Sequence, residues 1–192
     1  MDTLHIQRLD PERPPLRIHI VFDAPECVAH PDTPSLRNAA EGLRQRGHRL
    51  ELIHVRLASG PGEGQPLGRY AKFKRILQLR RLLIAHWSRQ RPDLVHIDTQ
   101  GPLGWAALQA AAKLRIPASA SFPGEYATVP LGLLHKPLAA ELRKFFTRVR
   151  ATLVTGQAAS ESLRHAGLRN LHVLHPGPDL GGIEQALRSA MR

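Results

Sequence analysis

The chain has 192 residues, a length that fits one domain, and 42% of them are hydrophobic, which excludes a wholly disordered protein. The net charge of +11 favours anionic partners such as phosphates, nucleic acid or an acidic membrane surface. The single cysteine, Cys27, excludes a disulfide scaffold. No apolar run approaches the roughly 20 residues that are needed to cross a bilayer. We therefore expect a cytoplasmic protein.

Residues 1–15 are predicted to form a flexible N-terminal tail, because three prolines oppose regular structure there and apolar residues are few. After this tail, short apolar runs alternate with longer segments of helical periodicity. Strands are predicted at Leu16–Phe22, Arg49–Leu57, Asp93–Asp98, Pro117–Phe122, Ala151–Thr155 and Leu171–His175. Helices are predicted at Ser35–Arg46, Tyr70–Arg89, Leu103–Leu114, Pro137–Val149, Gln157–Ala166 and Ile183–Met191. A loop rich in Gly and Pro is predicted at Ala58–Leu67.

The alternation of strands and helices predicts an α/β fold. We expect a single Rossmann-like domain over residues 16–180, with a parallel β-sheet and helices on both faces. Residues 181–192 are predicted to form a C-terminal helix or the start of a second domain. Because ligands of such sheets bind at the carboxyl ends of the strands, the residues directly after each strand are the candidate site.

Three stretches resemble segments of the retaining family-4 glycosyltransferases, in the same order along the chain. RPDLVHIDTQGPLGWAALQAAAKLRIP, at Arg91–Pro117, resembles the family segment PDVVHVHTPGPLGLAAL…LGIP. VTGQAASESLRHAGLRNLHVLHPGPD, at Val154–Asp179, resembles VTPSRAMAERLRALGVRNVRVIPNGVD. LRNAAEGLRQRGHRLELIHV, at Leu36–Val55, resembles LARALRARGHEVTVVAP.

The resemblance implies the N-terminal domain of an enzyme of the GT-B fold, in which two Rossmann-like domains face a cleft. In that family the first domain usually binds the acceptor, and the second binds most of the nucleotide-sugar. The chain is therefore expected to be a glycosyltransferase-like acceptor-side domain that lacks the nucleotide-sugar-binding second domain and is inactive alone. No cofactor is expected, and a nucleotide-sugar donor is expected only with a second domain.

Three positions depart from the family's pattern. No Gly-Gly-type loop is recognisable after the first strand, where Asp23–Ser35 stands. Pro123 occupies the position at which relatives have a histidine near the transferred sugar, and Asp98 replaces the family's second histidine after the third strand. Proline has no ionisable side chain, so no catalytic residue is assigned. A non-catalytic binding module of the same fold is the alternative function.

The candidate residues for binding an acceptor or an anion follow the third and fourth strands. They are Asp98, Thr99, Gln100, Gly101, Glu125 and Tyr126. Thr99 is predicted to cap the next helix, and the N–H groups beside Gly101 favour an anion or a sugar hydroxyl. The alternative is an ordinary capped helix without a ligand. Glu125 corresponds to an acidic position of the family and can orient sugar hydroxyls, or it is a solvated loop residue.

The helix predicted at Tyr70–Arg89 is basic and amphipathic. From Tyr70 to Arg91 the chain has seven Lys or Arg residues and no acidic residue. Its apolar arc is predicted to comprise Tyr70, Phe73, Ile76, Leu77, Leu79, Leu83, Ile84 and Trp87. In one interpretation, an anionic membrane binds a surface formed by Lys72, Lys74, Arg75, Arg80 and Arg81. In the other, the apolar arc covers the sheet and the charges are solvated.

The spacing of the eleven histidines predicts no metal site. His172 and His175 have an odd separation, so on a strand their side chains would point to opposite faces. Cys27 is interpreted as an inert thiol. No G-x-S-x-G elbow and no GxxxxGK[ST] loop is present, which counts against a hydrolase or an NTPase.

The expected partners follow from these interpretations. They are a sugar or glycolipid acceptor, an anionic membrane surface, and a partner protein that supplies a second domain or a second copy of the chain in a homodimer. Membrane contact would place the protein at the inner face of the cell membrane as a peripheral protein. Nucleic acid is not expected as a partner, because aromatic residues make up only 5% and no nucleic-acid-binding motif is recognised.

Overall fold

The computed structural model describes residues 14–22, 36–54, 68–123, 136–174 and 180–191. Its strands are β1 (Arg17–Val21), β2 (Arg49–Ile53), β3 (Leu94–Ile97), β4 (Ala118–Ser121), β5 (Ala151–Thr155) and β6 (Leu171–Leu174). Its helices are α1 (Leu36–Gln45), α2 (Arg69–Arg89), α3 (Pro102–Leu114), α5 (Lys136–Phe146), α6 (Gln157–His165) and α7 (Leu180–Ser189). Each predicted strand and helix is present, with ends that differ by a few residues. The predicted tail up to residue 13 and the loop at 58–67 lie outside the described residues.

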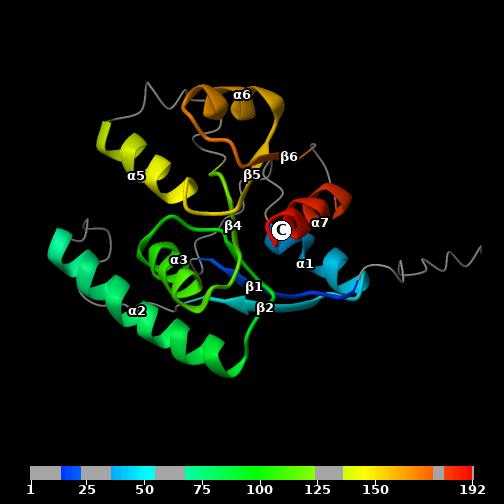
Figure 1. Cartoon of the computed structure of the whole chain (residues 1–192), viewed down its shortest axis with the longest axis horizontal. Coiled ribbons are helices and arrows are strands. Elements are labelled where there is room, and N and C mark those ends of the chain that lie inside the picture. The colour runs from blue at the N-terminus through cyan, green and yellow to red at the C-terminus, as the bar shows by residue number, and fades with distance from the viewer. Residues whose placement is uncertain (1–13, 23–35, 55–67, 124–135, 175–179, 192) are drawn as a thin grey trace, which may run out of the picture.

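All strands form one parallel sheet in the order β2-β1-β3-β4-β5-β6 (Figure 1). Parallel neighbours have to be joined by crossover connections, and a helix follows every strand along the chain. Every residue of β3 is buried, as expected for an inner strand that has helices on both sides. The predicted Rossmann-like α/β fold is therefore confirmed.

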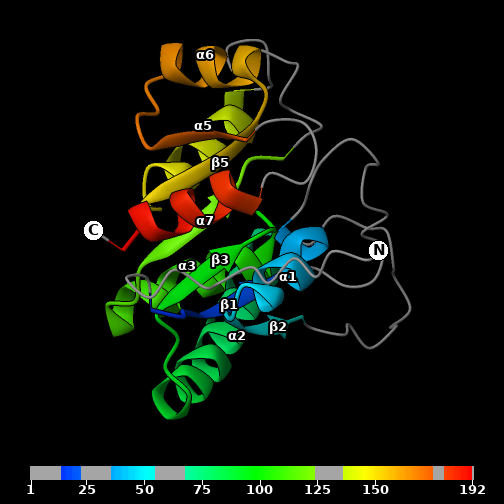
Figure 2. The same ribbon diagram turned by 90° about the vertical axis from the view of Figure 1, so that its right-hand side faces the viewer.

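Helices cover both faces of the sheet (Figure 1 and Figure 2). α1 and α7 pack on one face, in a core that includes Ile18, Ile20 and Leu94. α2, α3, α5 and α6 pack on the other face, in a larger core that includes Val21 and Val95. Successive residues of β1 and β3 thus enter opposite cores, as the two-residue period of a strand requires.

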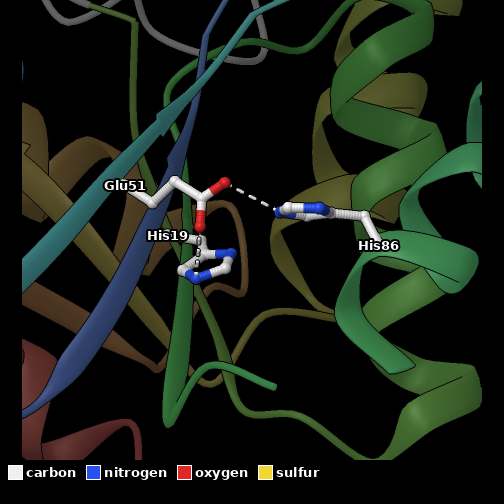
Figure 3. A group of neighbouring side chains, drawn as sticks. All are labelled: His19, Glu51 and His86. Carbon is white, nitrogen blue, oxygen red and sulfur yellow. Dashed lines mark ion pairs between the residues drawn. The ribbon is translucent and has the colours of Figure 1, made fainter. Parts of the chain in front are cut away.

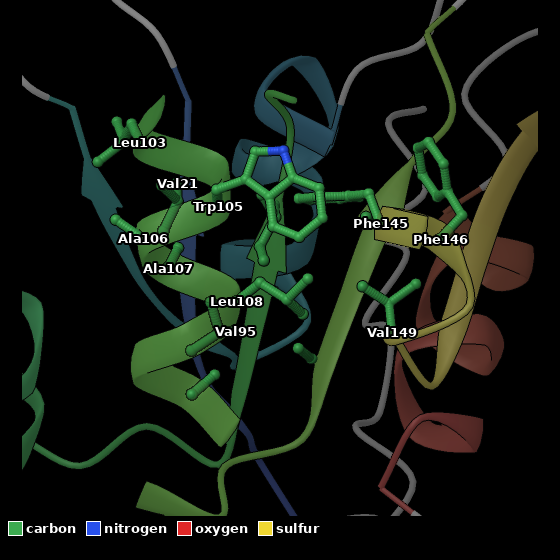
Figure 4. Packing of buried hydrophobic residues seen from close by; sticks show 14 of the residues in the cluster. Val21, Val95, Leu103, Trp105, Ala106, Ala107, Leu108, Phe145, Phe146 and Val149 are labelled. Carbon is green, nitrogen blue, oxygen red and sulfur yellow. The ribbon is translucent and has the colours of Figure 1, made fainter. Parts of the chain in front are cut away.

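The larger core contains aromatic side chains where α3 meets α5 (Figure 4). The ring centroids of Trp105 and Phe145 are 5.2 Å apart in an edge-to-face arrangement, and Phe145 packs in the same way on Phe146. The indole Nε1 of Trp105 donates a hydrogen bond to Oε1 of Glu141 at 3.2 Å, so its polar edge is satisfied. This packing fixes α3, whose first turn borders the candidate site described below.

Only part of the predicted apolar arc of α2 is buried. Leu79, Leu83 and Trp87 enter the core, but Tyr70 is 81% exposed and Phe73 is 59% exposed. The interpretation in which the whole apolar arc covers the sheet is therefore wrong for these two aromatic residues, because the buried part of α2 begins after its first turns. Although α2 has 21 residues, neither it nor another helix among the described residues is long and apolar enough to cross a membrane.

Glu184 holds α7 against α1. Its carboxylate lies 3.2 Å from Nη1 of Arg46 and accepts a hydrogen bond from Nε of Arg188 at 2.9 Å. Burial by itself would raise the pKa of Glu184, but the hydrogen bonds from Arg188 and Arg46 outweigh it and lower the pKa. The carboxylate is thus ionised and connects the two helices that cover this face of the sheet.

Candidate functional site

The strand order places a topological switch point between β1 and β3. β2 lies on one side of β1, whereas β3 and all later strands lie on the other side. In open parallel sheets, ligands bind at such a point, outside the carboxyl ends of the strands. The loop Asp98–Gly101 starts here, and the N–H of Asp98 donates a hydrogen bond to the carbonyl of Val21 at 2.8 Å. Most of the predicted acceptor-binding residues therefore lie together at the switch point.

The first turn of α3 ends this loop without a capping side chain. Gly101 is the N-cap residue, and Pro102 begins the helix. The prediction that Thr99 caps α3 is therefore wrong. Thr99 is only 6% exposed, and its Oγ1 accepts a hydrogen bond from the N–H of Gly101 at 3.2 Å, because it lies two residues before the N-cap position. Pro102 has no N–H and that of Gly101 is bonded to Thr99, so the later N–H groups in the first turn of α3 are those left to favour an anion or a sugar oxygen.

Gln100 connects two loops at this edge of the sheet. Its Nε2 donates a hydrogen bond to the carbonyl of Ser121, the last residue of β4, at 3.1 Å. Pro123, in the position of the family's histidine, is half-buried two residues further on. Glu125 and Tyr126 lie outside the described residues. The part of the predicted site that the structure describes is thus the loop after β3.

His96 lies in the centre of the sheet, close to this edge. Its Nδ1 is 2.9 Å from Oγ of Ser119, and its Nε2 is 2.9 Å from Oγ of Ser121. Burial lowers the pKa of His96 to about 3, so the imidazole is neutral at pH 7. A neutral imidazole has one donor and one acceptor nitrogen, and the two hydroxyls can satisfy both. His96 therefore contributes no positive charge to the candidate site.

The basic surface predicted on α2 is smaller in the structure. Nζ of Lys72 lies 2.5 Å from Oε1 of Glu141 on α5, so Lys72 is paired. Nε of Arg80 is buried. Lys74 and Arg81 are exposed, and Arg75 is half-buried. The surface that remains for an anionic partner consists of these last three residues, and we refer to them as the basic surface.

A cluster of ionisable side chains that sequence spacing did not reveal lies between β1, β2 and α2 (Figure 3). Nε2 of His19 is 3.1 Å from Oε2 of Glu51, and Nε2 of His86 is 2.8 Å from Oε1 of the same carboxylate. Burial lowers the pKa of His19, and Glu51 partly opposes this effect. These residues are far apart in sequence, but the parallel register of β1 with β2 places His19 beside Glu51. The cluster thus depends on the strand register, which a single sequence does not reveal.

The other histidines that the structure describes are not part of a further group of this kind. Nε2 of His172 is 3.0 Å from Oγ of Ser189 on α7. His175 and Cys27 lie outside the described residues. Among the residues that the structure describes, His19, Glu51 and His86 form the group with enough ligand atoms close together to hold a metal ion.

A model of Glycosyltransferase Family 4 matches residues 34–181. No curated protein matches the sequence. Among solved structures, the chain is similar to MnaA of S. aureus, solved with UDP, with 14% identity and a TM-score of 0.56 over 82% of this chain and 43% of that one. It is also similar to the UDP-GlcNAc 2-epimerase of Methanocaldococcus jannaschii, with 12% identity and a TM-score of 0.55 over 91% of this chain and 49% of that one. At such identities the likeness concerns the fold, and the chain spans less than half the length of these two proteins.

Proposed function

Because the chain belongs to Glycosyltransferase Family 4, we propose that it forms the acceptor side of a glycosyl-transfer site. The observation that carries this proposal is the position of the loop Asp98–Gly101. It lies inside the region that matches the family and at the topological switch point of the sheet. The acceptor in this proposal is a hydroxyl group of a sugar or a glycolipid.

The polar groups of this loop suit a ligand that carries many hydroxyl groups. A carboxylate such as that of Asp98 accepts hydrogen bonds from hydroxyls, and the first-turn N–H groups of α3 donate to sugar oxygens. Gln100 keeps the loop in place through its hydrogen bond to Ser121. Holding an acceptor hydroxyl in a fixed position accelerates transfer by proximity.

We assign the nucleotide-sugar donor to a second domain, in the same chain, in a partner protein or in a second copy. Two considerations support this assignment. The chain spans 43% of MnaA, the protein solved with UDP. A departing diphosphate also needs cationic or N–H groups, and Pro123 supplies neither at the family's histidine position. A domain of residues 1–192 without that second domain is therefore expected not to transfer sugar.

We expect simple glycosides to bind the loop after β3. The ¹⁵N-labelled chain would be titrated with the methyl glycosides of glucose, galactose, mannose and N-acetylglucosamine, and separately with UDP-, GDP- and ADP-glucose. The amide signals of Asp98–Gly101 should shift with at least one glycoside. Gln100→Ala should weaken that binding about tenfold, because it removes one hydrogen bond that positions the loop.

Gln78→Ala is the matched control, because Gln78 is exposed on α2. This variant should bind as the wild type does. The assignment to the acceptor side is wrong if no glycoside shifts the Asp98–Gly101 signals, or if a nucleotide-sugar alone binds there.

A second candidate function is docking on an anionic membrane at the cytoplasmic face, as a non-catalytic binding module. The supporting observation is the exposure of Tyr70 and Phe73 on the helix that carries the basic surface. Aromatic and cationic side chains together suit a membrane interface. This function is compatible with a glycolipid acceptor, since both would bring the protein to a membrane.

Neutralising the basic surface should weaken binding to phosphatidylglycerol vesicles about 100-fold. The variant combines Lys74→Gln, Arg75→Gln and Arg81→Gln. Each cation near an anionic surface contributes about 1 kcal/mol, so three contribute about 3 kcal/mol. Co-sedimentation over a range of lipid concentrations measures the change.

The control variant removes the same net charge at exposed positions elsewhere, through Lys113→Gln, Arg164→Gln and Arg169→Gln. It should retain most of the vesicle binding. Equal losses in both variants would mean that only the net charge attracts the lipid, and membrane docking through α2 would be rejected.

A further inference from the structure

Three side chains from separate elements meet between the edge of the sheet and α2 (Figure 3). His19 is 1% exposed, whereas Glu51 and His86 are 38% and 37% exposed. One possible ligand atom from each residue can be chosen so that all three atoms lie within 4.8 Å of one another. The cluster lies in the middle of β1 and β2, away from the loop Asp98–Gly101 at their carboxyl ends.

The histidines of this cluster have unsatisfied polar atoms. Nδ1 of His19 and Nε2 of His86 are buried and have no hydrogen-bond partner among the described residues. Nε2 of His86 lies 2.8 Å from the carboxylate of Glu51 without making a hydrogen bond of acceptable geometry. A buried polar atom without a partner is destabilising, so an ion that accepts the lone pair of Nε2 of His86 would stabilise that side chain, whereas in His19 it is Nε2, not the unpartnered Nδ1, that faces Glu51.

The donor set matches the preferences of a divalent transition metal. Imidazole nitrogens and a carboxylate oxygen are common zinc ligands, at about 2.0–2.2 Å from the metal, and tetrahedral ligands are then roughly 3.4 Å apart. The two measured separations, 3.1 Å and 2.8 Å, are both shorter than that value, and they end on different oxygens of Glu51. To hold one ion, the imidazoles would have to move slightly away from the carboxylate, which could bind through one oxygen or through both.

The cluster is also accessible from outside. Glu51 and His86 line a hollow of about 320 Å³ between β2 and α2. His19 and Glu51 line a second hollow of about 380 Å³. Glu51 borders both hollows, so an ion can approach its carboxylate from either side, and each hollow has space for a water molecule as the fourth ligand.

We propose that His19, Glu51 and His86 bind a divalent transition-metal ion, with zinc the best match, through three protein ligands and one exchangeable water. The ion would connect β1, β2 and α2 and thereby hold the basic helix on the edge strand. This site is separate from the proposed acceptor loop and does not depend on it. The competing arrangement is a carboxylate that merely pairs with two histidines, and it predicts no stoichiometric metal binding.

The test is metal binding to the full chain after dialysis against a chelator. Cobalt(II), added alone, should bind with one equivalent and give the visible absorption of a tetrahedral site, and zinc should displace it. Zinc at 100 times its dissociation constant should raise the Tm by about 5 °C. Glu51→Gln and His86→Gln should each weaken cobalt binding roughly 100-fold, because each removes one ligand.

His165→Gln is the matched control, since His165 is exposed on α6 and is one of nine histidines outside the cluster, which can bind metal weakly. It should leave the cobalt spectrum unchanged. Circular dichroism without metal shows whether each variant is folded, and His86→Gln, at a half-exposed position, keeps the test valid if Glu51→Gln does not fold. The proposal is overturned if the wild type gives no tetrahedral cobalt spectrum, or if folded His86→Gln binds cobalt as tightly as the wild type.

Discussion

Replacing Gly104 with alanine is expected to lower the free energy of unfolding by about 3 kcal/mol. An ideal Cβ at this position would lie 1.9 Å from the carbonyl oxygen of Thr99 and 2.8 Å from its carbonyl carbon. Both are backbone atoms, so no side-chain rotation can relieve the overlap, and α3 has to move away from the loop after β3. Chemical denaturation followed by circular dichroism measures the change.

Gly68→Ala is the matched control, because a Cβ at Gly68 meets nothing within 4 Å. Its expected effect on the free energy of unfolding is below about 1 kcal/mol. Gly104→Ala should also weaken glycoside binding, since the displaced loop carries Asp98 and Gln100. Equal stability of the two variants would contradict the close approach of α3 to the loop.

Acid is expected to destabilise the protein through His96. Burial lowers the pKa of His96 from 6.5 in the unfolded chain to about 3 in the native one. Above pH 6.5 the imidazole is neutral in both the native and the unfolded chain, so its titration does not change the free energy of unfolding. Below pH 6.5 the unfolded chain binds a proton that the native chain does not, so the free energy of unfolding falls by up to about 1.4 kcal/mol per pH unit. This loss continues until the pH reaches the native pKa of about 3.

His96→Gln should remove this contribution, because glutamine keeps a polar group near Ser121 and does not titrate. The decrease in the free energy of unfolding from pH 7 to pH 5 should be about 2 kcal/mol smaller than in the wild type. Urea denaturation at pH 8, 7, 6 and 5 measures it, and the value at pH 8 reports the packing effect of the substitution alone. Burial also lowers the pKa of His19 and of His48, and their contributions cancel in the comparison. An equal decrease in both proteins would contradict a neutral, buried His96.

Most of the fold could be predicted from the sequence. The apolar runs that became β1, β3 and β5 are short and continuous, as in strands that are buried on both faces, and a helical segment follows each. An alternation of strands and helices predicts a parallel sheet with helices on both faces. The weakly apolar strand β4, with the sequence ASAS, was also predicted, although its pattern is less clear than those of the other strands.

The candidate site was predicted only in part. The loop Asp98–Gly101 could be located, because strand ends follow directly from the strand prediction. The role predicted for Thr99 was wrong. The helix begins two residues later than a Thr99 cap requires, so the Thr99 hydroxyl reaches the N–H of Gly101 and not those of the first helical turn. Helical periodicity gave the buried face of α2 but not the point along the helix where burial begins, so the exposure of Tyr70 was missed.

The His19, Glu51 and His86 cluster was missed for a different reason. Its members come from β1, β2 and α2, and they are too far apart in the sequence to form a recognisable motif. The information lies in the alignment of β1 with β2, where His19 is opposite Glu51. Sequence analysis of one chain predicts the strands but not the register between them.

Register has a further consequence at the centre of the sheet. His96 is opposite Ser119 in the pairing of β3 with β4, and Ser121 lies on the same face two residues later. A slip of one residue would turn both serines to the other face and leave both imidazole nitrogens without partners inside the protein. The small alanines of β4 distinguish poorly between such alignments, so a polar contact selects the correct one. His96 thereby disfavours incorrect pairing of β4, whose own sequence specifies its alignment poorly.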